Sequence, residues 1–150
     1  MQGVAIRSAK ATDLQAVNAL MHGSSAYQGD YYAIIENYFV TEQYLAANQV
    51  FVAEQNGKLL GFYGLIVGDI PDLDLMFVSD AAQGLGVGRM LFEHMKQAAG
   101  QKGIANVQIG AHPSAVGFYE RMGAVRVGTC PPTPKISWAR PLLKLHILEN

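Results

Sequence analysis

Hydrophobic and polar positions follow two spacings along this 150-residue chain, and the spacing predicts most of its elements. Apolar residues three or four positions apart are typical of a helix with one buried face, and short apolar runs are typical of buried strands. The helical spacing covers residues 12–21, 31–47, 87–99 and 113–122. Strand-like runs cover residues 4–7, 49–55, 59–67, 73–78, 104–109, 124–127 and 136–148.

Turn and cap residues support these boundaries. Thr12 and Gln15 have the spacing of a capping box at the start of the first helix. Asn56-Gly57 between two apolar runs predicts a tight hairpin, and Gly123 is a natural stop for the last helix. The order of elements, three consecutive strands followed by alternating helices and strands, predicts a mixed sheet covered by helices.

Composition predicts one domain spanning residues 1–150, because half of the residues are hydrophobic and only 15% are charged. A net charge of −1 provides no basic field for nucleic acid. No stretch reaches the roughly 20 apolar residues that span a bilayer, so we expect no membrane association. The start of the chain also lacks the pattern of a signal peptide, and we expect a cytoplasmic protein.

The metal-binding and redox residue types are sparse. Cys130 is the only cysteine, which rules out an internal disulfide and fits a reducing compartment. The four histidines are scattered without ligand spacing, so no metal site is expected; they are His22, His94, His112 and His146.

The segment with the clearest chemistry is the glycine-rich run 83–89, Gln-Gly-Leu-Gly-Val-Gly-Arg, between a predicted strand and a predicted helix. Glycine leaves backbone N–H groups uncovered and permits the φ values of a tight loop. A helix that begins directly after such a loop adds unpaired N–H groups and the positive end of its dipole. These features predict a site for a phosphate or pyrophosphate.

Two common phosphate loops do not fit this run. A Walker A loop requires Lys and then Ser or Thr after its last glycine, but Arg89 and Met90 follow Gly88. The dinucleotide fingerprint requires G-x-G-x-x-G after the first strand, whereas this G-x-G-x-G run follows the fourth.

Two blocks make the chain resemble the GNAT superfamily of acetyl-CoA-dependent N-acetyltransferases. The family signature Gln/Arg-x-x-Gly-x-Gly/Ala is matched by Gln83, Gly86 and Gly88. A second block, residues 112–124, resembles the family's later helix, which often ends Phe-Tyr-Glu-Lys/Arg-x-Gly. Two positions depart from the family pattern: Ser114 stands where Asn is frequent, and no proline follows Val78.

The resemblance implies an α/β fold with a mixed, mostly antiparallel sheet of six or seven strands and about four flanking helices. Two splayed parallel strands, 73–78 and 104–109, would form a wedge for acetyl-CoA, with no metal. The implied cofactor-binding residues are Met76, Phe77, Val78, Gln83, Gly84, Leu85, Gly86, Val87, Gly88, Arg89, Ser114 and Phe118.

Acid–base roles follow from the same resemblance. It implies that Tyr119 is the general acid that protonates the leaving thiolate, and a tyrosine pKa near about 10 suits a thiol near about 8.5. A base must also deprotonate the incoming ammonium group. Asp72 and Asp74 lie two apart and so face the same side of a strand, and either could serve, as could His112.

The acceptor is expected to be a small-molecule primary amine. Aromatic residues with nearby carboxylates in the first helical region would suit a cation, and Arg140 could meet a substrate carboxylate. The expected substrate-binding residues are Tyr27, Tyr31, Trp138 and Arg140. Protein or peptide N-acetylation and a non-catalytic acyl-CoA sensor are the alternatives, and a homodimer is a further expectation from the resemblance.

Overall fold

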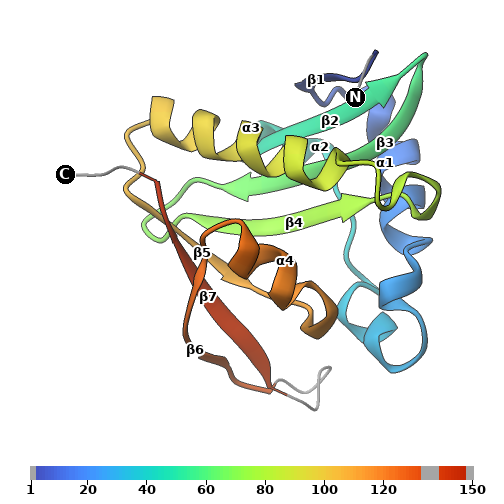
Figure 1. Ribbon diagram of the computed structural model, residues 1–150. Coiled ribbons are helices and arrows are strands. Elements are labelled where there is room, and N and C mark those ends of the chain that lie inside the picture. Colours follow the sequence, from blue (N-terminus) through green and yellow to red (C-terminus); the bar gives the residue numbers. More distant parts are fainter. Residues whose placement is uncertain (1–2, 133–138, 148–150) are drawn as a thin grey trace.

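The protein is described by a computed structural model that covers residues 3–132 and 139–147. Seven strands form one sheet in the order β1-β2-β3-β4-β5-β7-β6 (Figure 1). Neighbouring strands are antiparallel except for β4 and β5, which confirms the expected mixed, mostly antiparallel sheet. The strands are β1 (Ala5–Ser8), β2 (Gln49–Gln55), β3 (Lys58–Ile66), β4 (Asp72–Val78), β5 (Asn106–Gly110), β6 (Val125–Cys130) and β7 (Arg140–His146).

Helices cover both faces of the sheet. Helix α1 lies on one face, while α3 and α4 lie on the other (Figure 1). The α-helices are α1 (Leu14–His22), α2 (Glu42–Ala47), α3 (Val87–Gln101) and α4 (Val116–Arg121), and short 3-10 turns are η1 (Ala11–Asp13), η2 (Ser25–Tyr27), η3 (Gly29–Ile34), η4 (Asp80–Ala82) and η5 (Pro113–Ala115). Among the described residues, no helix combines the length and the apolar character needed to cross a membrane.

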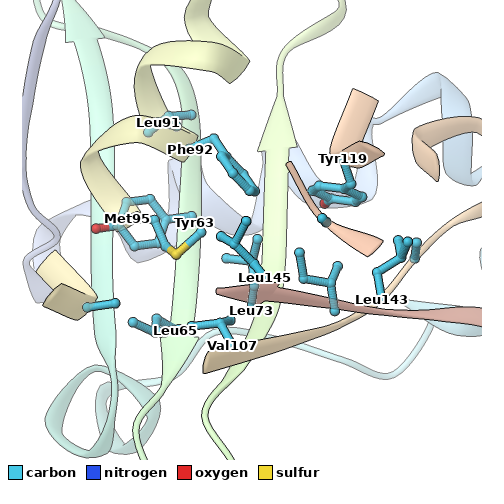
Figure 2. Packing of buried hydrophobic residues seen from close by; sticks show 14 of the residues in the cluster. Tyr63, Leu65, Leu73, Leu91, Phe92, Met95, Val107, Tyr119, Leu143 and Leu145 are labelled. Atoms are coloured by element: carbon cyan, nitrogen blue, oxygen red, sulfur yellow. The ribbon is translucent and has the colours of Figure 1, made fainter. Parts of the chain in front are cut away.

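The larger core lies between the sheet and helices α3 and α4. Leu91, Phe92 and Met95 of α3 pack over strand residues such as Tyr63 and Leu145 (Figure 2). This cluster includes residues of β3, β4, β5 and β7, so it joins the two halves of the sheet. Each large apolar side chain that is fully buried contributes about 1.5 to 3 kcal/mol of folding free energy.

The predicted hairpin at Asn56-Gly57 is confirmed. Both residues have positive φ angles, 53° and 78°, and Gln55 pairs with Lys58 across the turn. Positive φ at both central positions is the type I′ geometry, whose twist matches that of the two strands.

The prediction of one helix over residues 31–47 is wrong. The structure has the 3-10 turn η3 and then the short helix α2, separated by a segment that contains Val40. The side chain of Asn18 accepts from the Val40 N–H at 2.8 Å and donates to its C=O at 2.9 Å. The Thr41 side chain then caps α2 by accepting from the Tyr44 N–H. A contact 22 residues away in sequence therefore replaces the helical hydrogen bonds at Val40.

Other boundaries also differ from expectation. Helix α1 begins at Leu14, and its N-cap is Asp13 rather than Thr12. The Asp13 side chain does not cap α1 but accepts from the Lys10 N–H at 2.8 Å, which closes the preceding turn η1. The last strand covers 140–146 instead of 136–148, where residues 136–138 and 148 lie outside the described ranges. Strand β5 begins two residues later than predicted.

Candidate active site

Strands β4 and β5 diverge immediately after they meet. Their only parallel pairing in the described structure joins Asp72 and Gln108, and the Gln108 N–H also donates to the Pro71 carbonyl at 2.9 Å. Beyond this point the edge of β4 that faces β5 has no strand partner. The divergence opens a wedge between two strands of one sheet, as the fold resemblance implied.

A β-bulge lies on β4 beside this opening. The pairing of β3 with β4 moves from Gly64–Leu75 to Leu65–Leu73, so β4 contains one extra residue, Asp74. A bulge redirects a side chain and is frequent next to functional sites. The bulge here places the Asp74 carboxylate within reach of two tyrosines, described below.

The glycine-rich run forms the loop that precedes α3. Gly84 and Gly86 have φ angles of 79° and 86°, which side chains rarely tolerate, and Gly86 is the N-cap of α3. The N–H of Met90 makes the first helical bond, to the Gly86 carbonyl. The N–H groups of residues 87–89 therefore have no partner inside the helix. Together with the helix dipole, they form a cradle for an anion.

A cavity of about 550 Å³ lies between this loop, the open edge of β4 and helix α4. Most of the expected cofactor-binding residues line it, which brings two distant sequence blocks together. They are Met76, Phe77, Val78, Gln83, Gly84, Gly86, Val87, Gly88, Arg89, Ser114 and Phe118. Leu85 does not line the cavity, because its side chain is exposed and its N–H donates to the Ala82 carbonyl.

Sequence reasoning missed two parts of this cavity. The turn Ser24–Tyr27 forms one wall, and Ser25 is held to Asp80 near the glycine loop by a hydroxyl contact of 3.1 Å. Arg121 also lines the cavity, so with Arg89 two cationic side chains surround the space. The signal for Arg121 was present, since it occupies the Lys/Arg position of the second block.

A second cavity, of about 240 Å³, adjoins the first. Tyr38, Asp74 and Arg140 line only this second space. The residues on the walls of both cavities are Tyr27, Met76, Phe77, His112 and Tyr119. The two spaces therefore meet at the divergence of β4 and β5.

Tyr119 lies at this meeting point and is 7% exposed. Its ring packs against Phe92 and Phe118, with centroids 6.0 and 5.5 Å away. Burial raises the pKa of the Tyr119 hydroxyl above its usual value, so the hydroxyl stays protonated at neutral pH. No hydrogen-bond partner is seen for this hydroxyl among residues 3–132 and 139–147, and its proton is available to a bound molecule.

The two candidate carboxylates have different environments. One oxygen of Asp74 accepts from the hydroxyls of Tyr38 at 2.5 Å and Tyr44 at 2.8 Å, and Asp74 lines the second cavity. Asp72 lies on neither cavity wall, and the Gln108 side chain donates to it at 2.8 Å. Burial raises the pKa of Asp72, and the negative charge of Asp74 adds to this effect. Of the two carboxylates, only Asp74 lines one of these two cavities.

His112 is held as a neutral wall residue. Its Nδ1 accepts from the Ser114 N–H at 3.0 Å and also contacts the Ser114 hydroxyl at 2.7 Å. Its ring lies 4.5 Å from the rings of both Tyr27 and Tyr31. Burial lowers the pKa of His112, so the ring is uncharged at neutral pH. With Nδ1 engaged, His112 is a weaker candidate for the base than Asp74.

The expected acceptor residues are only partly brought together. Tyr27 and Arg140 line the second cavity. Tyr31 lies behind its wall, against His112, and Trp138 falls outside the described residues. The contribution of Tyr44 had no sequence signal, because it depends on a hydrogen bond to a residue 30 positions away.

Comparisons with known proteins agree with this geometry. The family model described as "Acetyltransferase (GNAT) domain" matches residues 16–130. The peptidyl-lysine N-acetyltransferase YiaC of Escherichia coli K12 is 31% identical over 124 residues, which cover 79% of this chain and 81% of that protein.

Solved structures share the fold. The ribosomal-protein-S18-alanine N-acetyltransferase of Escherichia coli superposes with a TM-score of 0.74 at 23% identity, covering 98% of this chain and 96% of that one. A GNAT family acetyltransferase of Elizabethkingia anophelis with acetyl-CoA bound gives a TM-score of 0.69 at 19% identity, covering 97% and 99%. The family match, the relative that is 31% identical and the shared fold together show that the chain belongs to the GNAT acetyltransferase family and is an N-acetyltransferase.

Proposed function

We propose that this protein transfers the acetyl group of acetyl-CoA to the primary amine of a small molecule by direct attack. The observation that carries the proposal is the meeting of two cavities at Tyr119, where β4 and β5 diverge. The larger cavity has the features of a cofactor site, and the smaller has the size and charges of an acceptor site.

The larger cavity suits the chemistry of acetyl-CoA. Unpaired N–H groups at the start of α3 fit a pyrophosphate, and Arg89 and Arg121 add positive charge nearby. The open edge of β4 can pair with the amide groups of the pantetheine arm near Phe77 and Val78. A structural relative from Elizabethkingia anophelis has acetyl-CoA bound, which supports the same assignment for this fold.

When bound, acetyl-CoA supplies an activated acetyl thioester. A β4 N–H near Val78 would polarise the carbonyl oxygen of that thioester. Tyr119 would donate its hydroxyl proton to the departing sulfur, since the hydroxyl is protonated and lines both cavities. The amine nitrogen gains the acetyl group and loses a proton, and the cofactor leaves as the thiol.

Asp74 would receive the amine. A protonated amine is drawn to the carboxylate, and its proton must leave before the nitrogen can attack. Tyr38 and Tyr44 both donate to the same oxygen, Oδ2, and hold that side chain in place. The other oxygen, Oδ1, is then available to the amine or to a water that carries its proton away.

A lysine side chain of a protein is the second candidate acceptor. The relative from Escherichia coli that is 31% identical is named a peptidyl-lysine N-acetyltransferase. A single lysine side chain is also small enough for a cavity of about 240 Å³.

The test combines binding and turnover. Acetyl-CoA should raise the melting temperature saturably, because it binds the folded state. A panel of small amines and lysine peptides should then give thiol release with at least one amine class. Binding without thiol release from any acceptor would support a non-catalytic acyl-CoA sensor instead, and no thermal shift would contradict the cofactor assignment.

Tyr119→Phe tests the general acid. It should lower kcat by about 10²- to 10⁴-fold while the Kd for acetyl-CoA stays unchanged, because only the proton donor is lost. Tyr63→Phe is the matched control, since Tyr63 is also buried but lines neither cavity, and its hydroxyl contacts His94. Equal kcat values for the Tyr119→Phe variant and the unmodified enzyme would overturn this role.

A further inference from the structure

Arg140 places a positive charge on the wall of the second cavity, and no ion pair joins it to a carboxylate within residues 3–132 and 139–147. It is the first residue of β7 and pairs with Cys130 of β6, so the sheet fixes its backbone. Its Nε is buried and has no hydrogen-bond partner within the described parts of the chain. A buried donor without a partner is costly to a folded protein.

The charge of Arg140 acts on the residues around the cavity. Burial raises the pKa of the Tyr27 hydroxyl to about 12 although the charge of Arg140 opposes this rise, and the same charge opposes the rise that burial causes in the pKa of Asp72. Neither of these side chains forms an ion pair with Arg140 in the described structure; the ion pairs seen there join Arg7 to Asp13 and Glu54. Arg140 therefore lines the cavity without an ion-pair partner among the described residues.

The same cavity has a negative charge on another strand. Asp74 lies on β4 and Arg140 on β7, and both line the space of about 240 Å³. Tyr38 and Tyr44 donate to Asp74, and no ion pair joins this aspartate to a cation in the described parts of the chain. A ligand that pairs with both Asp74 and Arg140 needs a cationic group and an anionic group.

We propose that the acceptor is a small zwitterion, a primary amine that also has a carboxylate, and that Arg140 is the residue that binds the carboxylate. This inference rests on the proposed function and narrows its substrate class to amino acids and related amino carboxylates. Arg140 binds a carboxylate through its fork of N–H donors while the amine lies near Asp74 and Tyr119. A polyamine would put a second cation against Arg140, and an internal lysine of a protein would leave Arg140 without an anion.

The test compares matched acceptors that differ only in the carboxylate. Glycine, β-alanine, 4-aminobutyrate and lysine would each be assayed beside the corresponding carboxamide, with thiol release as the readout. The unmodified enzyme should prefer the best carboxylate over its carboxamide by about 10- to 100-fold in kcat/KM, the range expected for hydrogen bonds to a charged group. The amine of each carboxamide is less basic than that of the matching carboxylate, so more of it is unprotonated at neutral pH. Amine basicity alone would therefore favour the carboxamide.

Two variants attribute this preference to Arg140. Arg140→Gln should bring the ratio of carboxylate to carboxamide toward unity, and Arg140→Lys should retain part of it, because the charge remains but the forked geometry is lost. The thermal shift with acetyl-CoA should persist in both variants, which shows that they fold and keep the cofactor site. In both variants the KM for the carboxylate should be higher than in the unmodified enzyme, since Arg140 binds a group remote from the reacting atoms.

Different results would contradict the zwitterionic acceptor and the proposed acetyl transfer. If the unmodified enzyme acetylates carboxylates and carboxamides at equal rates, the proposal that the acceptor is a zwitterion is wrong, whether or not the variants fold. A carboxylate preference that survives in Arg140→Gln would overturn the role of Arg140. Thiol release with none of these amines, nor with the wider panel, would instead contradict the proposed function, and this inference would fail with it.

Discussion

Two tyrosines, Tyr38 and Tyr44, donate hydrogen bonds to a single oxygen of Asp74, whereas Asp72, two positions earlier, contacts an amide side chain. Only Asp74 lines the second cavity. Asp72 and Asp74 are equivalent candidates by their spacing in the sequence, but the structure gives them different hydrogen-bond partners and surroundings.

Asp74→Asn should lower kcat/KM for the amine by about 10²-fold or more without changing the Kd for acetyl-CoA, because the charge that attracts the ammonium group is lost. Asp72→Asn is the matched control and should keep kcat/KM close to that of the unmodified enzyme, since an Asn side chain can still accept from Gln108. Steady-state kinetics with one good acceptor measures both. The reverse ranking of the two variants would assign the base to Asp72.

Among the elements, the glycine loop has the most direct link between backbone geometry and function. Gly86→Ala should cost about 1 to 2 kcal/mol of stability because its φ of 86° is left-handed, and it should weaken acetyl-CoA binding about 10-fold by crowding the anion cradle. Gly57→Ala, at a φ of 78° in the distant β2–β3 hairpin, should cost similar stability and leave the Kd unchanged. Denaturant unfolding and calorimetric titration separate the two effects, and a loss of affinity in Gly57→Ala would show that strain alone is responsible.

At the start of the chain, an ion-pair network joins β1, η1 and β2. Arg7 forms paired hydrogen bonds with Asp13, at 2.8 and 3.0 Å, and with Glu54, at 3.0 and 3.1 Å. The hydrogen bonds from Arg7 lower the pKa of Asp13 below its usual value. A depressed carboxyl pKa stabilises the fold above the unfolded value, and this stability is lost as pH falls through the folded pKa.

Asp13→Asn should therefore be less stable than the unmodified protein by about 1 kcal/mol at pH 7, a value kept small because solvent partly screens the pair. The difference should shrink as pH falls below about 4, the unfolded pKa of aspartate. Urea unfolding at several pH values measures it. A gap that stayed constant down to pH 3 would mean that the variant loses packing rather than the ion pair.

For the whole molecule, the sheet consists of two parts that share one parallel pairing, Asp72 with Gln108, and a common core on the side of α3 and α4. A ligand in the wedge between β4 and β5 contacts both parts. Its binding should therefore slow amide hydrogen exchange in a local pattern as well as raising global stability.

Saturating acetyl-CoA should slow exchange at residues 73–78 and 84–89, where the open β4 edge and the glycine loop line the cavity. The β2–β3 turn at 55–58 should change little, because none of its residues lines the cavity. At 100 times the Kd, global stability should rise by about 2.7 kcal/mol. Hydrogen exchange followed by mass spectrometry checks this, and equal protection of all segments would contradict a site at the wedge.

Much of the architecture and of the cofactor site followed from local sequence signals. The β2–β3 hairpin depended on Asn56-Gly57, and the anion cradle depended on glycines at the start of an amphipathic helix. These signals work because φ preferences, unpaired N–H groups and apolar spacing are properties of a few adjacent residues. The same signals failed at residues 31–47, where Asn18 binds the Val40 backbone and interrupts the helical pattern.

The sequence by itself determined most of the order of the elements, the glycine-rich loop before α3 and the family to which the chain belongs. Only the tertiary structure decided which carboxylate lines the second cavity, that His112 is a wall residue, and that Arg140 has no ion-pair partner among the described residues. The physical reason is that burial, hydrogen-bond partners and neighbouring charge depend on contacts between distant segments. Asp74 and Arg140 are 66 positions apart in sequence, yet a bulge on β4 and the first residue of β7 place them on one cavity.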